Sequence, residues 1–310
     1  MPPPTSPGPA PLAPLSPATQ QALAQITADP APPELVRNTH YVVSNEDRLD
    51  LFRRATENRG GAYIGVGTDQ NYLLAAWAKP QLLVLFDFDQ VVVNVHHVYR
   101  AFFLVAKTPA ELRSLWEPRN EAPALAAINA AYTDEKRRAD CVRAYRMSRH
   151  AVTARFNKIL QVFGIHKVPW FLTDQAQYDT VAALFRADRV VMVRGDLTAG
   201  GAMTSIANAL SASGLKVGLL YLSNAERYFT YTPSFRKSLL ALPMDDKAIV
   251  LRTRARLDGV YEYISQDGAV FRAWLERSKI TLASQMSRLR EPDPQTPGAW
   301  VIRKLPDAAP

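Results

Sequence analysis

The sequence lacks the features that would mark it as a secreted, membrane-spanning or thiolate-metal protein. Among its 310 residues there is one cysteine, Cys141, which excludes an internal disulfide and a cluster of thiolate ligands. No apolar run reaches the roughly 18 residues that a membrane-spanning helix needs. The first twenty residues contain neither a basic start nor an apolar stretch suited to secretion. We therefore expect a cytoplasmic protein with no membrane partner.

Histidine is scarce as well, and the spacing of the five histidines does not predict a metal site. His96 and His97 are adjacent on an expected helix, where neighbouring side chains point about 100° apart, so they cannot comfortably bind one metal ion together. We expect both on the helix surface. The other three share no ligand spacing with an acid or with one another, and metal catalysis is not predicted.

Proline is concentrated near the ends of the chain. Eleven of the 23 prolines lie within the first 33 residues, and five lie between Pro292 and Pro310. We expect residues 1–16 to form a disordered leader and residues 291–310 a Pro-rich tail. Because 47% of all residues are apolar, the stretch 17–290 can form a single domain with a core of normal size.

Positive charge predominates, and a formal net charge of +8 favours anionic partners without requiring them. Much of the excess lies between Lys107 and Lys167, where twelve Lys or Arg residues stand against six Asp or Glu. We interpret this segment as a helical insert whose basic face is solvated or ion-paired, and which is placed to cover an acceptor pocket. Nucleic acid is an alternative partner, although no recognised RNA-binding module is present.

The middle of the chain alternates between apolar runs and amphipathic stretches. The expected strands span 62–67, 82–88, 168–172, 189–194 and 216–222, and the expected helices span 69–79, 91–106, 174–186, 200–210 and 269–287. This alternation predicts an α/β fold with a mostly parallel, Rossmann-like sheet, helices on both faces and the insert after the second strand. A turn at Leu257-Asp-Gly259 predicts a C-terminal antiparallel hairpin of strands 248–254 and 260–264.

A glycine-bearing loop follows the first expected strand. Gly65 and Gly67 let the backbone pass close beneath a ligand, and the helix that follows offers unpaired N–H groups. Asp87 lies twenty residues beyond Gly67, at the end of the next strand, where an acid can accept the hydroxyls of a ribose. A dinucleotide fingerprint requires glycine at position 70, and this chain has Gln70, which argues against a dehydrogenase.

Two short polar motifs also fall where this fold would place them at one crevice. Ser44-Asn-Glu46 is expected to begin a helix with Ser44 as its N-cap, and Ser223-Asn-Ala-Glu226 has the pattern of a capping box. If the two sets converge, they make a substrate site or a site for a cofactor ribose. Each acid expected near a strand end also has a structural interpretation, as a helix cap or as the partner of an arginine.

Four separated segments carry a resemblance to known proteins: Gly65-Val-Gly-Thr-Asp-Gln-Asn71, Tyr221-Leu-Ser-Asn-Ala-Glu226, Ser44-Asn-Glu46 and Gly195-Asp196. Over roughly residues 40–285 the chain resembles class I S-adenosylmethionine-dependent methyltransferases. More narrowly, it is similar to a poorly characterised bacterial family with GVGxDQN and YLSNxE segments. The resemblance implies S-adenosyl-L-methionine as the cofactor and a small molecule or peptide as the substrate.

The residues and the resemblance together suggest a role for each position. The expected catalytic residues are Asp196 and Glu226. The expected cofactor-binding residues are Gly65, Gly67, Asp69, Gln70, Asp87, Asp89 and Asp174. The expected substrate-binding residues are Ser44, Asn45, Glu46, Ser223 and Asn224.

Three functions are compatible with this assignment. The first is a methyltransferase-like enzyme that acts on a small molecule or peptide. The second is a non-catalytic ligand-binding or regulatory protein with the same fold, which is favoured because Tyr63 and Asp69 stand where methyltransferases usually have an acid and a third glycine. The third is a nucleic-acid-modifying methyltransferase that uses the basic insert.

Overall fold

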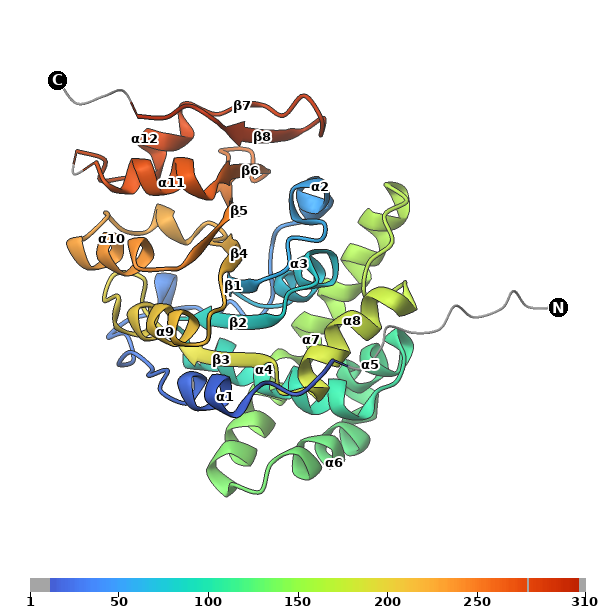
Figure 1. Cartoon of the computed structure of the whole chain (residues 1–310). Coiled ribbons are helices and arrows are strands. Elements are labelled where there is room, and N and C mark those ends of the chain that lie inside the picture. Colours follow the sequence, from blue (N-terminus) through green and yellow to red (C-terminus); the bar gives the residue numbers. More distant parts are fainter. Residues whose placement is uncertain (1–11, 278, 307–310) are drawn as a thin grey trace.

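The computed structural model describes residues 12–277 and 279–306, so most of the expected leader lies outside the described residues. Its centre is a sheet of eight strands in the order β3-β2-β1-β4-β5-β6-β8-β7 (Figure 1). The strands are β1 (Ala62–Val66), β2 (Leu82–Asp87), β3 (Val190–Arg194), β4 (Val217–Tyr221), β5 (Met244–Ala255), β6 (Tyr261–Asp267), β7 (Glu291–Pro292) and β8 (Ala299–Ile302). The first five are parallel, and β6 runs antiparallel to β5. The predicted fold class, with its C-terminal antiparallel hairpin, is confirmed.

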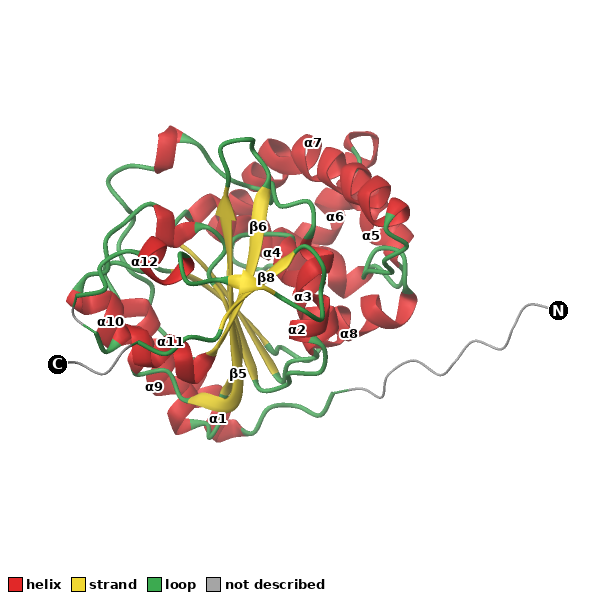
Figure 2. Ribbon diagram, turned by 90° about the horizontal axis from the view of Figure 1, so that it is seen from above, coloured by secondary structure: helices red, strands yellow, loops and turns green. Residues whose placement is uncertain are grey.

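Helices cover both faces of this sheet (Figure 2). One face carries α2 (Arg53–Thr56), α3 (Gln70–Ala78), α4 (Gln90–Val105), α8 (Gln175–Arg186) and the insert helices α5 (Pro109–Trp116), α6 (Glu121–Ala131) and α7 (Glu135–Ile165). The other face carries α1 (Pro17–Leu23), α9 (Gly201–Ala212), α10 (Pro233–Leu240), α11 (Gly268–Leu275) and α12 (Ala283–Ser287). The central strands β1, β2 and β4 are buried along their whole length because both faces are covered.

The predicted strand 168–172 is wrong, because these residues form a turn before α8. Pro169 has no backbone N–H to give to a sheet, and the carbonyl of Trp170 accepts the N–H groups of Thr173 at 2.8 Å and Asp174 at 2.9 Å. Trp170 and Phe171 are nevertheless buried. A short apolar run can therefore bury its side chains as a turn as well as in a strand.

The C-terminal part differs from expectation in two ways. The predicted closing helix 269–287 is divided into α11 and α12, and between them the guanidinium of Arg236 donates to the carbonyl oxygens of Leu275 at 2.7 Å and Arg277 at 3.0 Å. Residues 291–302, expected within a tail, instead extend the sheet through β7 and β8, because β8 pairs with β6 in parallel.

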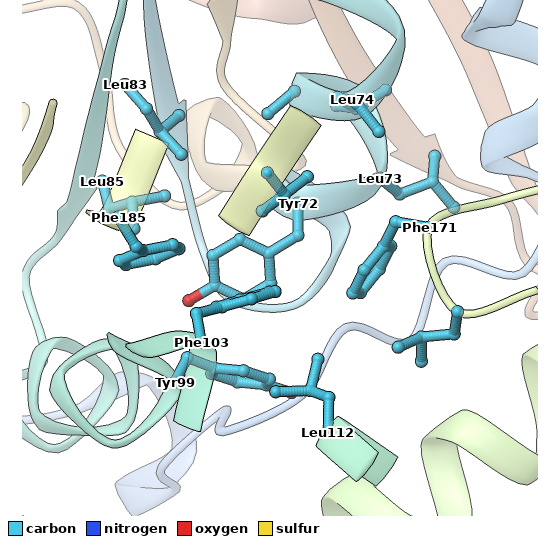
Figure 3. Packing of buried hydrophobic residues seen from close by; sticks show 14 of the residues in the cluster. Tyr72, Leu73, Leu74, Leu83, Leu85, Tyr99, Phe103, Leu112, Phe171 and Phe185 are labelled. Carbon is cyan, nitrogen blue, oxygen red and sulfur yellow. The ribbon is translucent and has the colours of Figure 1, made fainter. Parts of the chain in front are cut away.

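A cluster of aromatic side chains fills the space between the sheet and the insert side (Figure 3). The Phe103 and Phe185 rings stack with centroids 4.8 Å apart, and Tyr72 lies beside Tyr99 with centroids 4.7 Å apart. All four side chains are almost completely buried. These residues come from α3, α4 and α8, so the cluster packs these three helices against one another.

We expect Phe103→Ala to lower the free energy of unfolding by about 3–5 kcal/mol, because it removes a buried ring and leaves a cavity among its aromatic neighbours. The measurement is urea denaturation followed by far-UV circular dichroism. Leu257→Ala is the control, since Leu257 is fully exposed at the tip of the β5–β6 hairpin and should change stability very little. A cost below about 1 kcal/mol for Phe103→Ala would contradict the packing described here.

Candidate functional site

Residues 29–48, here called the strap, lie along the edge of the sheet at which the parallel strands end. Their only regular element is the 3-10 turn at Val36–Asn38. The strap meets the strands in their order in the sheet, from β3 through β2, β1 and β4 to β5 and β6. Its backbone and side chains bond Arg194, Asp89, Asp69, Ser223, Thr253 and Tyr263 in turn. In open α/β sheets ligands bind outside this edge.

Glu46 is the most completely bonded residue of the strap. Its Oε2 accepts the hydroxyls of Ser44, at 3.1 Å, and of Tyr221, while its Oε1 accepts those of Ser223, at 2.9 Å, and Thr253. Only 1% of Glu46 is exposed. No ion pair joins it to any cation in the described part of the chain. Among the described residues, four hydroxyl groups therefore stabilise this carboxylate. The pKa of Tyr221 is raised, mainly by burial and also by the charge of Glu46.

The two predicted substrate-binding sets do converge in space, although neither serine caps a helix as predicted. Ser44 precedes an extended stretch, and the next helical turn begins only at Leu49. Ser223 has a left-handed backbone, with φ 51°, and its hydroxyl turns to Glu46 instead of capping. Asn224 donates its amide to the Tyr261 hydroxyl at 3.4 Å.

The side chain of Asn45 lies close to the same hydroxyl, so Asn45 and Asn224 both face one tyrosine on β6.

Glu226 lies on the other face of the sheet. Its carboxylate is 2.9 Å from Arg252 Nε and accepts the hydroxyl of Tyr231, and both members of the ion pair are only 3–4% exposed. Arg252 and Thr253 are consecutive on β5, so their side chains point to opposite faces, and only Thr253 reaches the strap. The expected catalytic residue Glu226 is thus separated from the expected substrate-binding set.

The glycine loop is filled by its own side chains. A Cβ on Gly67, where φ is 94°, would collide with the amide of Gln70, and a Cβ on Gly65 would collide with Asn71. Gln70 Oε1 accepts the backbone N–H of Thr68 at 3.0 Å, and Asn71 Oδ1 accepts the Tyr63 hydroxyl at 2.6 Å. The expected open stretch of main chain is therefore occupied from within the loop and α3.

Arg155 of α7 joins the insert to the loop and the strap. It donates from Nε to Asp69 Oδ2 at 3.0 Å, from Nη2 to the Glu46 carbonyl at 2.6 Å and from Nη1 to Asp47 Oδ1 at 3.1 Å. Asp69 Oδ1 in turn accepts the backbone N–H of Ser44 at 2.7 Å. Asp69, expected to bind a cofactor, is therefore paired with Arg155 and connects the glycine loop to the strap.

Asp87 and Asp89 lie side by side at the end of β2. Asp87 accepts the N–H of Asp89 at 2.9 Å, and burial raises its pKa to about 7, although backbone N–H groups including that of Gly67 act in the opposite direction. Asp89 accepts the N–H of Val91 at 2.9 Å as the N-cap of α4, and His40 of the strap lies 2.7 Å from its other oxygen. Both acids are in the expected place, beside the glycine loop.

His96 is buried beneath the same loop, which corrects the expectation that it lies on the helix surface. Its Nε2 is 2.7 Å from the carbonyl of Gly67, which can only accept, so Nε2 carries the proton. Nδ1 then accepts the Tyr72 hydroxyl at 2.6 Å. Burial lowers the pKa of His96 to about 4, so the ring is neutral and holds the loop as a donor.

The other two expected acids form turns and caps. Asp174 accepts the N–H of Gln177 at 2.9 Å as the N-cap of α8, and the strand it was expected to follow is absent. Asp196 accepts the backbone N–H and the hydroxyl of Thr198, both at 2.7 Å, while its own N–H donates to Asp29 of the strap at 2.9 Å. Neither carboxylate lies with the Glu46 group.

The basic stripe of the insert is largely paired within the chain. Arg146 and Arg149 bond the two oxygens of Glu121, at 2.8 and 2.5 Å, and Arg143 bonds Asp140. Arg155 is buried. These contacts fit the expectation of an ion-paired helix face and leave fewer arginines for an anionic partner.

Three residues of the site were missed from the sequence. Tyr221 directly precedes the Leu-Ser-Asn segment, so the motif itself could have pointed to it. Thr253 lies in an expected strand, where its position in the period of two gave a weak signal. Arg155 gave none, because it lies 86 residues from Asp69.

Two further properties of residues 12–277 and 279–306 bear on other functions. Within these residues no helix has both the length and the apolar character needed to cross a membrane. The same ranges contain no group of three or more His, Cys, Asp or Glu side chains arranged to hold a metal ion.

We expect Arg155→Met to lower the free energy of unfolding by about 3–5 kcal/mol, because it leaves the buried Asp69 carboxylate without its cation. The matched control is Arg143→Met, whose side chain is 74% exposed and should cost no more than about 1 kcal/mol. Urea denaturation of both variants measures the difference. Equal costs would show that Arg155 is not needed to compensate Asp69.

We expect the stability of the wild type relative to Asp87→Asn to fall as pH rises from about 4 to 7. The folded protein keeps the Asp87 proton up to a pKa of about 7, whereas the unfolded chain releases it near 3.8. Unfolding therefore releases a proton within this window, and the difference can reach roughly 4 kcal/mol. His96 and His97, whose pKa values are lowered by burial, act with the opposite sign.

Both histidines are present in the two proteins and cancel in the comparison. The measurement is urea denaturation of wild type and Asp87→Asn at several pH values. A difference that does not change with pH would contradict a raised pKa at Asp87.

Comparison with models of known protein families gives a match over most of the chain. The model of a family described as "Domain of unknown function (DUF7790)" matches residues 41–302. No curated protein matches the chain.

Proposed function

Because the chain belongs to the DUF7790 family, whose function is unknown, we propose its function from the site: a ligand-binding protein that keeps a methyltransferase-like fold without transferring a methyl group. The ligand site is the edge of the sheet that the strap covers. S-adenosyl-L-methionine is the first ligand to test, because the resemblance of the glycine loop and Asp87 points to an adenosine-bearing molecule.

The main support for this proposal is that both acids expected to be catalytic already have partners within the protein. Glu226 is paired with Arg252 and Tyr231 on the far face of the sheet, and Asp196 is bonded within its own turn. A general acid or base must come within hydrogen-bond reach of the group that it serves. Neither expected catalytic residue has a carboxylate free at the edge, whereas Asp87 and Asp89, which we expect to bind the ligand, lie side by side at the end of β2.

The strap and Gln70 determine how a ligand would enter. An adenosine moiety beside Asp87 would lie against the loop 66–69, where the Gln70 amide now fills the space over Gly67. Hydrogen bonds from Ser44 and His40 hold the strap over the same place. We therefore expect binding to be opposed by these contacts and to improve when the Gln70 side chain is shortened.

The test is titration calorimetry with S-adenosyl-L-methionine, S-adenosylhomocysteine and adenosine. We expect saturable binding by the wild type, at least tenfold weaker binding by Asp87→Ala, corresponding to about 1.4 kcal/mol, and tighter binding by Gln70→Ala. Asp174→Ala is the control, because Asp174 caps α8 and should not affect affinity. If none of the three compounds binds, the proposal is wrong in its ligand.

A methyltransferase is the second candidate function. It is favoured by the strand order, in which a parallel core is followed by an antiparallel strand. Incubation with labelled S-adenosyl-L-methionine and a panel of small molecules and peptides separates the two. Label on an acceptor, lost in Glu226→Gln or Asp196→Asn, would replace the non-catalytic proposal by this one.

A further inference from the structure

The hydroxyl groups around Glu46 come from two different parts of the fold. Ser44 belongs to the strap, as Glu46 itself does. The other three come from the centre of the sheet. Tyr221 is the last residue of β4, Ser223 lies two residues beyond it, and Thr253 lies on β5. Tyr221 is completely buried and Thr253 is 5% exposed. The sheet therefore presents three fixed donors to one point at its ligand-binding edge, and the strap supplies the acceptor.

The arrangement of these donors fits a carboxylate in particular. Ser223 and Thr253 donate to one oxygen of Glu46, and Tyr221 donates to the other, so that two oxygens about one carbon are recognised. Arg155 does contact this residue, but it bonds the backbone carbonyl of Glu46 at 2.6 Å and not its carboxylate. A doubly charged phosphate would be poorly compensated by neutral donors in such a buried place, whereas a single negative charge can be stabilised by several hydrogen bonds.

We propose that Tyr221, Ser223 and Thr253 form a carboxylate-binding subsite, which Glu46 fills as an internal ligand. A small molecule or peptide with a free carboxylate displaces Glu46 and lifts this part of the strap. The proposal rests on the ligand-binding function proposed above, because it names the chemical group that this edge selects. It is distinct from the adenosine position, which lies at the end of β2.

The strap is suited to such an exchange. Residues 39–48 contain no helix or strand, and they are held to the edge by separate hydrogen bonds and by the contacts of Asp47 and the Glu46 carbonyl with Arg155. The backbone N–H groups of Ser44 and Arg48 donate to Asp69 at 2.7 Å and to the Tyr263 hydroxyl at 2.7 Å. Displacement of Glu46 would weaken both of these hydrogen bonds, so the exchange of these two amide protons reports directly whether the strap has moved.

The first experiment uses the full chain with Glu46→Ala, which empties the subsite. We expect its thermal midpoint to lie below that of the wild type and to rise by several degrees, in a saturable manner, with sodium acetate. Acetamide, which has the same shape without the charge, and sodium chloride at equal ionic strength should have little effect. The rise should be lost in Glu46→Ala/Thr253→Val and should be smaller in the wild type, where acetate must first displace Glu46. Equal responses to acetate and acetamide would overturn the proposal.

The second experiment needs no variant, so it decides the matter even if Glu46→Ala does not fold. Amide hydrogen exchange of residues 40–48 in the wild type is measured with propionate, and with chloride at equal ionic strength. We expect exchange at Ser44 and Arg48 to become several-fold faster with propionate only. Unchanged exchange would overturn the displacement of the strap. Neither readout involves an adenosine compound, so failure here is distinguishable from failure of adenosine binding.

Discussion

The guanidinium of Arg155 is the joint on which the edge of this protein depends. It joins three segments that are far apart in the sequence, because it lies on α7 and bonds the glycine loop through Asp69 and the strap through Asp47 and the Glu46 carbonyl. Burying one cation is costly unless its donors are satisfied, and here all three of its nitrogen atoms have acceptors. The helical insert is therefore part of the site, because its longest helix holds the strap against the sheet.

The buried acids of the edge are stabilised by four different means. Asp69 has a cation, Glu46 has four hydroxyl groups, and Glu226 has both an arginine and a tyrosine. Asp87 has mainly backbone N–H groups, which do not offset burial, so its pKa is raised to about 7. These differences matter for function, because burial brings the pKa of Asp87 close to neutral, and Glu46 sits among side-chain hydroxyls that another carboxylate could use.

The sequence predicted the parts of this structure that follow from local periodicity. Continuous apolar runs marked the parallel strands, and Leu257-Asp-Gly259 marked the hairpin. The site depends on contacts that periodicity does not encode. Ser44 and Ser223 are residues typical of helix N-caps, yet the hydroxyl of each donates to the carboxylate of Glu46. Hydrogen bonds to a buried charge outweigh a helix cap, which contributes about 1 kcal/mol. Glu226 was placed correctly after β4, but the alternation of Arg252 and Thr253 along β5 sends it to the opposite face.

The glycine loop and the strap both cover the edge, but the strap is the easier of the two to move. This difference decides where a ligand enters. Gln70 and Asn71 fill the loop from the first turn of α3, so their side chains are held near Gly65 and Gly67 by the chain itself. His96 adds a hydrogen bond to the Gly67 carbonyl from below. The strap, in contrast, contains no helix or strand along residues 39–48, and its hydrogen bonds and its contacts with Arg155 are made to partners that stay in place when it leaves. Opening the strap exposes Asp89, the hydroxyl subsite and the approach to Asp87 together, without unfolding a helix or a strand. A ligand that engages this edge is therefore expected to enter under the strap, and its affinity will include the free energy of lifting it.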